Sequence, residues 1–246
     1  SDESIPMDLG DDTINGNGGT DRIVAQGLRG AVTLNDTLLS GLGLDSIASI
    51  ELAQLEAAAA AQINASAFSG PVTLFGSSAG DSLTGSASAD VIRGGNGNDT
   101  IKAGDGNDTI TGGVGSDSID GEAGTDLQTE TTGCSVLVTA ALVQGGNPLG
   151  TDKYFNLESM QFIGNPGANK FDTRLFSGNV TLLGGDGNDT LLTSGGNDSL
   201  VGEGGNDFLT GGAGDDTLDG GDGVDRLIEA ANTDWTLTNS ALTGLG

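Results

Sequence analysis

The chain has 246 residues, of which 45 are glycine and only 4% are aromatic, and it contains no histidine and one cysteine, Cys134. Eight basic residues against 35 acidic ones give a net charge of −27, which excludes nucleic acid as a partner, disfavours anionic membranes and makes cations the expected ligands. Zinc and copper would find few ligands here, and this composition is poor material for an ordinary globular core.

Residues 1–24 contain two nine-residue units, in which turn residues precede a short polar–apolar–polar segment. The units place Asp12 and Asp21 at the same position, with Ile14 and Ile23 as the inward residues. Neither unit has a coil partner upstream in the sequence, so we expect no complete metal site there.

Residues 25–75 form a first linker, in which the glycine pattern stops and apolar residues alternate with polar ones. The alanine run at 57–61 could form a helix, because alanine is the best helix former. Its counterpart in the second linker, residues 164–172, contains two glycines and Pro166, which do not suit a helix. We therefore expect metal-free solenoid coils in both linkers, with a short helix after Glu51 or flexible hinges as the alternatives.

Residues 76–129 form block one, which runs in phase for six nonapeptides starting at Gly76, Gly85, Gly94, Ala103, Gly112 and Gly121. The first two units carry Ala79 and Ser88 in place of the fourth-place glycine, so we expect strained turns or loose metal binding. The last unit puts Gln128 at the inward position, which marks the exit from the repeat.

Residues 130–183 form a second linker that repeats features of the first. Residues 164–172 have Asn169 where the repeats carry aspartate, and the eleven residues that follow match those after residue 64, including Phe176 for Phe68. Block two, residues 184–228, has five units with an inward leucine row at Leu191, Leu200, Leu209, Leu218 and Leu227.

Residues 229–246 begin a truncated linker, because residues 237–246 match residues 34–43. We expect the chain to be an excised piece of a longer array, with any export signal or catalytic domain outside it. Trp235 is expected to pack in a core, and Cys134 to behave as a small, half-buried hydrophobic residue.

The period decides the chemistry that we expect. Each unit is a turn followed by a minimal strand with one inward side chain, so two units make a coil of 18 residues and coils stack roughly 4.8 Å apart. Asp99 and Asp117 then lie one above the other, and Asp90 and Asp108 do so on the opposite edge. Such a pair repels by about 3 kcal/mol at an effective dielectric of about 20. A calcium ion between them would lie roughly 2.4 Å from each level, with glycine-turn carbonyls as further ligands.

The nonapeptide G-G-x-G-x-D-x-U-x, seen in residues 94–102 as GGNGNDTIK, resembles the RTX (repeats-in-toxin) family of hemolysin-type calcium-binding repeats. The resemblance implies an all-β fold, a parallel β-roll or β-solenoid with two calcium-loaded blocks. It also implies a large secreted bacterial parent, exported by a type I system, that folds when it meets calcium outside the cell.

The resemblance further implies the ligands of about seven calcium ions. Each ion takes the carbonyls of places two and four and the aspartate of one unit, and the carbonyls of places one and three and the aspartate one coil later. In block one this joins Gly95, Gly97 and Asp99 to Gly112, Val114 and Asp117, and Gly104, Gly106 and Asp108 to Gly121, Ala123 and Asp126. In block two it joins Gly185, Gly187 and Asp189 to Gly202, Gly204 and Asp207, then Ser194, Gly196 and Asp198 to Gly211, Ala213 and Asp216, and Glu203, Gly205 and Asp207 to Gly220, Asp222 and Asp225. Two weaker sites join Ser77, Ala79 and Asp81 to Gly94, Asn96 and Asp99, and Ser86, Ser88 and Asp90 to Ala103, Asp105 and Asp108.

The leading functional hypothesis is a non-catalytic, calcium-stabilised structural segment of a secreted or cell-surface protein. The alternatives are an accessory module of a secreted polysaccharide-active enzyme and a ligand-binding adhesin region, with surface polysaccharide or matrix as the partner. Against catalysis, the chain lacks a nucleophile with a neighbouring base, and Asp152, Lys153 and Tyr154 are the nearest to an acid/base cluster. Ice binding would favour a row of threonines, which the third places of the repeats lack.

Overall fold

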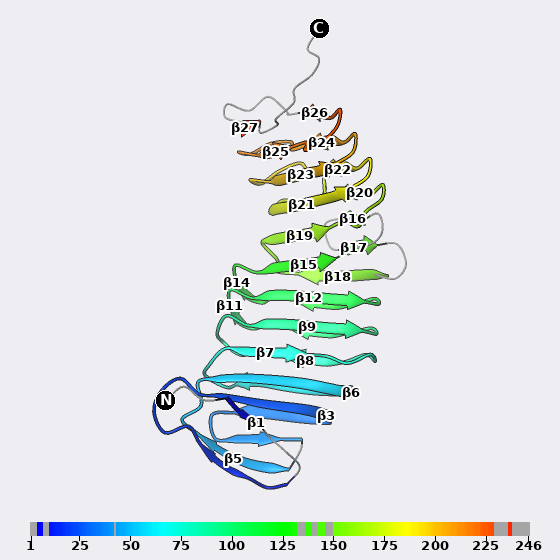
Figure 1. The fold of residues 1–246 in the computed structure, drawn as a ribbon. Helices are drawn as coiled ribbons and strands as arrows, with labels where there is room; N and C mark the ends of the chain where they lie inside the picture. The colour runs from blue at the N-terminus through cyan, green and yellow to red at the C-terminus, as the bar shows by residue number, and fades with distance from the viewer. Residues whose placement is uncertain are drawn as a thin grey trace. The chain divides into compact units, whose positions relative to one another are not determined.

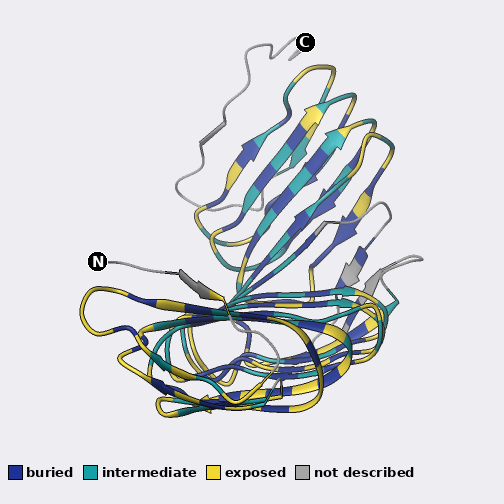
Figure 2. Cartoon of the chain, turned by 60° about the horizontal axis from the view of Figure 1, so that its bottom comes forward, coloured by how far each residue is buried: buried dark blue, intermediate teal, exposed yellow. Residues whose placement is uncertain are grey.

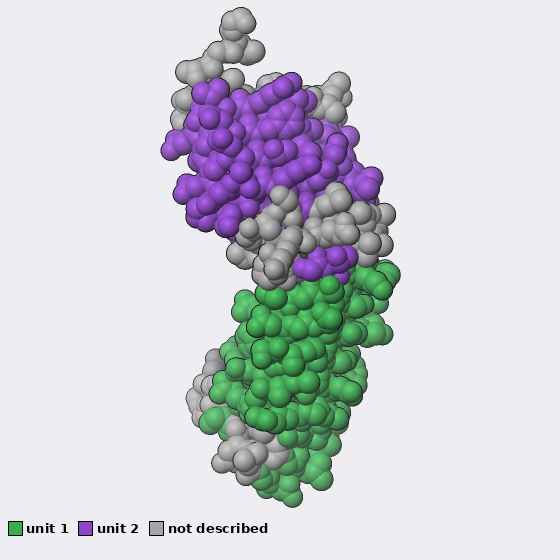
Figure 3. Space-filling model, turned by 90° about the vertical axis from the view of Figure 1, so that its right-hand side faces the viewer, with its two compact units in different colours: residues 1–128, 152–157 green, residues 129–151, 158–246 purple. Residues whose placement is uncertain are grey.

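The computed structural model describes residues 4–6, 10–41, 43–131, 136–138, 142–145, 150–228 and 236–237 (Figure 1). These residues form strands and turns and contain no helix. They belong to two compact units, residues 1–128 with 152–157 and residues 129–151 with 158–246 (Figure 3). Cys134, Trp235 and most of the duplicated segment at 237–246 lie outside the described residues.

The first unit is a parallel solenoid with strands in two stacks. One stack contains β7 (Val72–Phe75), β9 (Val91–Asn96), β12 (Thr109–Val114) and the first residues of β15 (Leu127–Thr131). The other contains the end of β6 (Leu52–Ala67), then β8 (Ser82–Thr84), β10 (Thr100–Lys102), β13 (Ser118–Asp120) and β18 (Thr151–Phe155). Within block one each residue pairs with the residue 18 positions later, as in Ile101 and Ile119, so the predicted coil length is correct.

The start of this unit is less regular. β1 (Ser4–Pro6) pairs with the first residues of β3 (Arg22–Asn35), and β2 (Thr13–Asn15) pairs with β5 (Leu44–Ala48). Our expectation that the unit holding Asp21 has no upstream partner was therefore wrong. β4 (Leu38–Ser40) runs antiparallel to both β3 and β5, an exception to the parallel arrangement.

The alanine run at 57–61 lies in β6 and is not helical. β6 pairs along β3, with Leu28 opposite Ala57 and Gly30 opposite Ala61. Ala57 and Ala61 are buried, and the neighbouring strand supplies the backbone hydrogen bonds that a helix would have made internally. Tertiary pairing thus overrides the helix propensity of alanine.

The second unit repeats the two stacks. One holds β19 (Ser159–Ile163), β21 (Asn179–Asp186), β23 (Ser199–Gly204), β25 (Thr217–Asp219) and β27 (Thr236–Leu237). The other holds β16 (Val136–Val138), β20 (Lys170–Asp172), β22 (Thr190–Leu192), β24 (Phe208–Thr210) and β26 (Arg226–Ile228). β17 (Leu142–Gly145) pairs antiparallel with β16. The fold is therefore an all-β parallel roll, as predicted.

Buried and more exposed positions alternate along many strands of each unit (Figure 2). The apolar residues at the buried positions form the core. In the first unit these include Leu83, Ile101 and Ile119 from one stack, and Leu74, Ile92 and Ile110 from the other, all essentially inaccessible. In block two the predicted leucine row is buried from Leu191 to Leu218, and Leu227 is partly exposed. Each coil adds about 1.5–3 kcal/mol per buried side chain, and the turns at the coil edges are fixed by this stacking.

Candidate metal centre

Most turns of the strong repeat units have left-handed backbone at places two and four; the unit that begins at Thr193 has it at place four alone, because Ser194 does not have a positive φ. Gly95 and Gly97 have φ of 106° and 112°, which glycine adopts without strain. Glu122 and Glu203 adopt φ of 65° and 71° at place two, so the turn keeps this conformation even without glycine there. Turns of successive coils also pair, as in β11 (Asp105–Gly106) and β14 (Ala123–Gly124).

The sixth-place aspartates stack in ladders. The backbone N–H of Asp99 donates to Oδ1 of Asp117, 2.8 Å away and one coil later, and the N–H of Asp90 donates to Oδ1 of Asp108 at 2.8 Å. The same bond, between 2.7 and 2.9 Å, joins Asp81 to Asp99, Asp108 to Asp126, Asp189 to Asp207, Asp198 to Asp216, and Asp207 to Asp225. The aspartates from Asp81 to Asp216 are at most 4% exposed, and Asp225 is partly exposed. Each carboxylate is thus held by the coil before it.

The second carboxylate oxygen has a different environment. Among the described residues, no hydrogen-bond donor reaches the buried Oδ2 atoms of Asp99, Asp108, Asp117, Asp189, Asp207, Asp216 and Asp225. Burying such an oxygen without a donor is costly. These atoms need a cation or a proton.

Where place one of the unit is glycine, this unpaired oxygen lies close to the position that a side chain there would take. A Cβ on Gly112 would lie 2.7 Å from Oδ2 of Asp117. A Cβ on Gly94 would meet both Oδ2 of Asp99 and, at 2.5 Å, the carbonyl oxygen of Gly112 in the next coil. Gly184 and Gly202 have the same surroundings. Two oxygens that point into one small buried space fit a hard cation with oxygen ligands, as calcium is.

The electrostatics agree with this fit. Burial, together with the charges of neighbouring aspartates, raises the pKa of Asp99 to about 6 and that of Asp108 to about 7. In block two burial raises the pKa of Asp198 and of Asp207 to about 6. The ionised ladder is therefore unfavourable by itself, and a nearby positive charge would lower these pKa values again.

The first two units of block one differ from the others. Oδ2 of Asp81 accepts hydrogen bonds from the N–H and hydroxyl of Ser77, at 2.7 and 3.0 Å. Oδ2 of Asp90 accepts from the N–H and hydroxyl of Ser86, at 2.6 and 3.2 Å. Neither serine has positive φ. Second-place serine therefore does in these turns what a cation would do elsewhere, which gives a physical reason for weak metal binding there.

The carbonyls that the resemblance assigns to calcium lie at the coil edges, and several of them accept hydrogen bonds. The carbonyl of Gly104 accepts from the N–H of Ala123 at 3.1 Å, and that of Val114 from the N–H of Gly97 at 2.7 Å. A carbonyl oxygen has a second lone pair, so these bonds leave room for a metal. In the part of the chain that the structure describes, no group of three or more His, Cys, Asp or Glu side chains could hold a metal. Carbonyl ligands are thus essential to any site.

Three ladder residues in the linkers escaped the sequence analysis. Asp152 accepts the N–H of Asp117 at 2.9 Å, Asp45 accepts the N–H of Asp12 at 3.0 Å, and Glu51 accepts the N–H of Asp21 at 2.9 Å through Oε2. The signal that could have found two of them is an acidic residue two positions before an inward apolar one, as in Asp45-Ser-Ile and Asp152-Lys-Tyr.

The acid/base cluster considered at residues 152–154 does not assemble. Strand alternation buries Asp152 and Tyr154, at 1% and 5% exposure, and leaves Lys153 on the outer surface. Burial also raises the pKa of Tyr154 to about 12. Asp152 is part of the ladder, because its Oδ1 holds the coil of Asp117.

A parallel β-roll whose turns stack buried aspartates against inward carbonyls defines a calcium-binding repeat module. The sequence model of the RTX calcium-binding nonapeptide repeat, described as four copies, matches residues 8–27, 75–110, 93–127, 177–200 and 192–227, together half of the chain. The chain belongs to this family of hemolysin-type repeats. A comparison with curated proteins found no match. Within the described residues, no helix is long and apolar enough to cross a membrane.

Proposed function

We propose that this chain is a structural segment of a secreted or cell-surface bacterial protein, and that it folds when calcium binds after export. One observation carries the proposal: ladder aspartates such as Asp99, Asp117 and Asp207 have one oxygen held by the preceding coil and a second, buried oxygen that no donor of the described residues reaches. Protein groups alone do not complete this arrangement. The family match favours calcium as the missing partner.

The residues that would hold the ions are those of the predicted ligand sets, residues 94–126 in block one and residues 185–225 in block two. The Oδ2 atoms of Asp99 and Asp189 and the carbonyls of Gly112 and Gly202 already converge in pairs. A bound calcium ion would supply the positive charge that neutralises two successive levels of the ladder. We propose about seven such ions, with weaker binding at Asp81 and Asp90, where serines satisfy the carboxylates.

Folding on calcium binding follows because apolar burial must offset both carboxylate repulsion and the loss of chain entropy. The chain carries a charge of −27, and each coil buries few apolar side chains, so the calcium-free coils gain little to offset carboxylate repulsion and chain entropy. Repeats of this family occur in secreted bacterial proteins, where calcium is abundant outside the cell. The linkers, residues 25–75 and 130–183, would join the loaded blocks as calcium-free coils, and residues 1–24 and 229–246 would continue the array.

Far-ultraviolet circular dichroism of the chain in millimolar calcium and in chelator tests this proposal. We expect a β-rich spectrum and a cooperative thermal transition in calcium, and a largely disordered spectrum in chelator. Magnesium at the same concentration is the control, because it demands a stricter octahedron and should restore little structure. An identical spectrum and melting temperature with and without calcium would refute the proposal.

A further inference from the structure

The coil before block two contains an exception to the ladder. Asn169 takes the sixth place of the unit at residues 164–172, where the repeats have aspartate. Its backbone is in the ladder: the N–H donates to Oδ1 of Asp189 at 2.7 Å, and its carbonyl accepts from the N–H of Thr190 at 2.9 Å. Asp189 and Asp207 are joined in the same way, at 2.8 Å. Asn169 is therefore one more level of the column below Asp189.

The side-chain amide of Asn169 points into the space where the column would hold a cation. Its Nδ2 lies 2.9 Å from the carbonyl oxygen of Asn165, 3.1 Å from that of Gly184 and 3.4 Å from Oδ1 of Asp189, and it also donates to the carbonyl of Gly167. In the nonapeptide frame these are places two and four of one unit, place one of the next coil, and the aspartate of the next coil. They are four of the oxygens that the ligand pattern assigns to one calcium ion.

The orientation of the amide is fixed by these neighbours. All four are acceptors, so an amide turned the other way would put its own oxygen among oxygens. Oδ1 instead lies on the other side, buried, and no donor within the described residues reaches it. Asn169 is only 3% exposed, so water does not compete for the amide. The two N–H groups of the Asn169 amide therefore place partial positive charge next to these oxygens. At the neighbouring levels the corresponding carboxylate oxygen has no such donor among the described residues.

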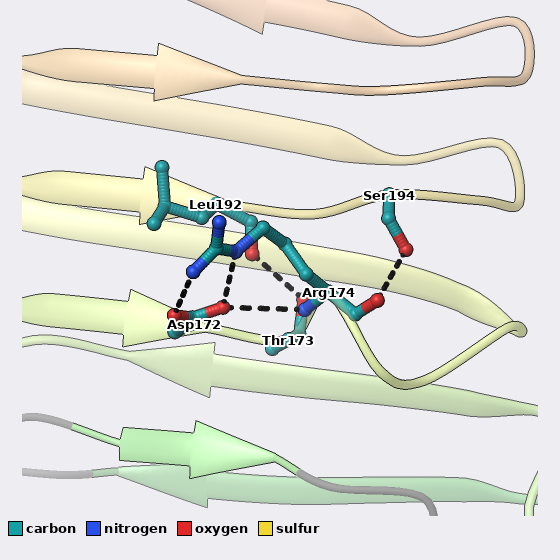
Figure 4. Close-up of polar contacts among 5 residues, drawn as sticks. All are labelled: Asp172, Thr173, Arg174, Leu192 and Ser194. Atoms are coloured by element: carbon teal, nitrogen blue, oxygen red, sulfur yellow. Dashed lines mark hydrogen bonds and ion pairs between the residues drawn. The ribbon is translucent and has the colours of Figure 1, made fainter.

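The rest of this coil is also closed by protein contacts (Figure 4). Arg174 forms a two-pronged ion pair with Asp172, with Nε 2.7 Å from Oδ1 and Nη2 2.6 Å from Oδ2. The N–H and hydroxyl of Thr173 donate to the carbonyl of Leu192, and the hydroxyl of Ser194 donates to the carbonyl of Arg174 at 2.6 Å. The coil thus neutralises its own acid and docks on block two directly.

The first linker has no side-chain amide at this position. The position that corresponds to Asn169 is Ala61, whose N–H donates to Oδ1 of Asp81 at 2.6 Å but whose side chain has no polar atom. There Ser77 satisfies the other oxygen of Asp81. Both blocks therefore begin on a coil that needs no metal. In block one a serine hydroxyl satisfies the aspartate, and in block two an asparagine amide fills the position.

We propose that the side-chain amide of Asn169 takes the place of one calcium ion, so that the coil at residues 164–176 is a metal-independent base on which block two stacks. This inference rests on the proposed calcium ladder, since the amide substitutes for an ion only if the levels above bind one. It gives block two a preformed first coil, on which its calcium-bound coils add.

Asn169→Asp tests the proposal, because it should turn the protein-filled position into an ion site. By equilibrium dialysis with calcium, we expect the variant to bind one ion more than the wild-type chain. In chelator it should have less β structure than wild type, and calcium should restore it. Asn188→Asp is the matched control, because it adds the same charge at an exposed residue of block two and should leave the ion count unchanged.

The outcomes separate the two proposals. A wild-type chain that binds no calcium refutes the proposed function, whereas a wild-type chain that binds calcium while Asn169→Asp gains no ion overturns this inference. Should the variant fail to fold, hydrogen exchange of the Asn169 side-chain amide in calcium-loaded wild type gives the answer by nuclear magnetic resonance. We expect strong protection relative to the Asn188 amide, and equal exchange of the two would overturn the inference.

Discussion

Asp117 is held by Asp99 through one carboxylate oxygen and left without a donor at the other. The N–H of Asp99 reaches Oδ1 at 2.8 Å, while Oδ2 lies against Gly112 of its own turn. The bond sets the height of each coil, and the unpaired oxygen sets its requirement for a cation. The same residue type therefore determines both the spacing of the roll and its metal dependence.

Removing a carboxylate from the middle of a ladder should remove two ions. Asp108 accepts the N–H of Asp90, and its own N–H donates to Asp126, so it lies between two proposed sites. At calcium 100-fold above Kd each site contributes about 2.7 kcal/mol, so Asp108→Ala should lower Tm in calcium by on the order of 10 °C. Differential scanning calorimetry and calcium stoichiometry measure this. Asp215→Ala removes the same charge at an exposed side chain outside the proposed ligand sets and is the control, and equal losses in both variants would contradict the assignment.

The serines in the first two units of block one should determine how weakly these units bind calcium. Ser77→Gly and Ser86→Gly remove the hydroxyl donors to Asp81 and Asp90 and allow the left-handed turn of the strong units. We expect the calcium Kd of these units to fall roughly tenfold, which corresponds to about 1.4 kcal/mol. We also expect the double variant to be less stable than wild type in chelator. Isothermal titration calorimetry gives the affinity. Ser66→Gly, at an exposed serine, should change neither quantity, and unchanged affinity in the double variant would show that the hydroxyls do not compete with calcium.

Acid should partly replace calcium. The pKa of Asp99, Asp108 and Asp207 in the fold, about 6 to 7, lies above the 3.8 of an ordinary aspartate, so the folded chain binds protons more tightly than the unfolded one. Stability in chelator is then greatest near pH 4 and falls as the pH rises through 6 to 7. Circular dichroism between pH 4.5 and 8 should show β structure gained on acidification without calcium. In calcium the trend should reverse, because protonated carboxylates bind no metal; a calcium-free chain that gains structure as the pH rises would contradict this.

Asp152 should behave as a repeat aspartate although it lies in a linker. Asp152→Asn keeps an oxygen that can accept the N–H of Asp117. It removes the carboxylate, whose pKa is raised to about 7 by burial. We expect the loss of one bound ion and a smaller calcium-induced rise in Tm. Lys153→Ala, at the exposed neighbour, should leave both unchanged. If the two variants have the same ion count as wild type, the ladder ends at Asp117.

Much of the fold and of the candidate site was predictable because the repeat is local. An 18-residue coil with one inward residue in each strand fixes which aspartates stack, so the ladder from Asp81 to Asp126 and the leucine row from Leu191 to Leu218 follow from counting along the chain. Because each coil of the blocks stacks on the next at a fixed separation of 18 residues, the strand pairings there can be read from the sequence. The family resemblance added the carbonyl ligands.

The tertiary structure decided what the period does not encode. Asp45, Glu51 and Asp152 join the ladder across 33, 30 and 35 residues, and no fixed count predicts such spacings. Ala57 and Ala61 lie in a strand because β3 offers hydrogen bonds that outweigh local propensity. Whether a buried carboxylate oxygen meets a serine hydroxyl, an asparagine amide or only a carbonyl depends on how the coils are placed in space. The structure thus shows what each residue type does there: serine at place two or asparagine at place six supplies a donor, whereas the other levels leave the oxygen unpaired.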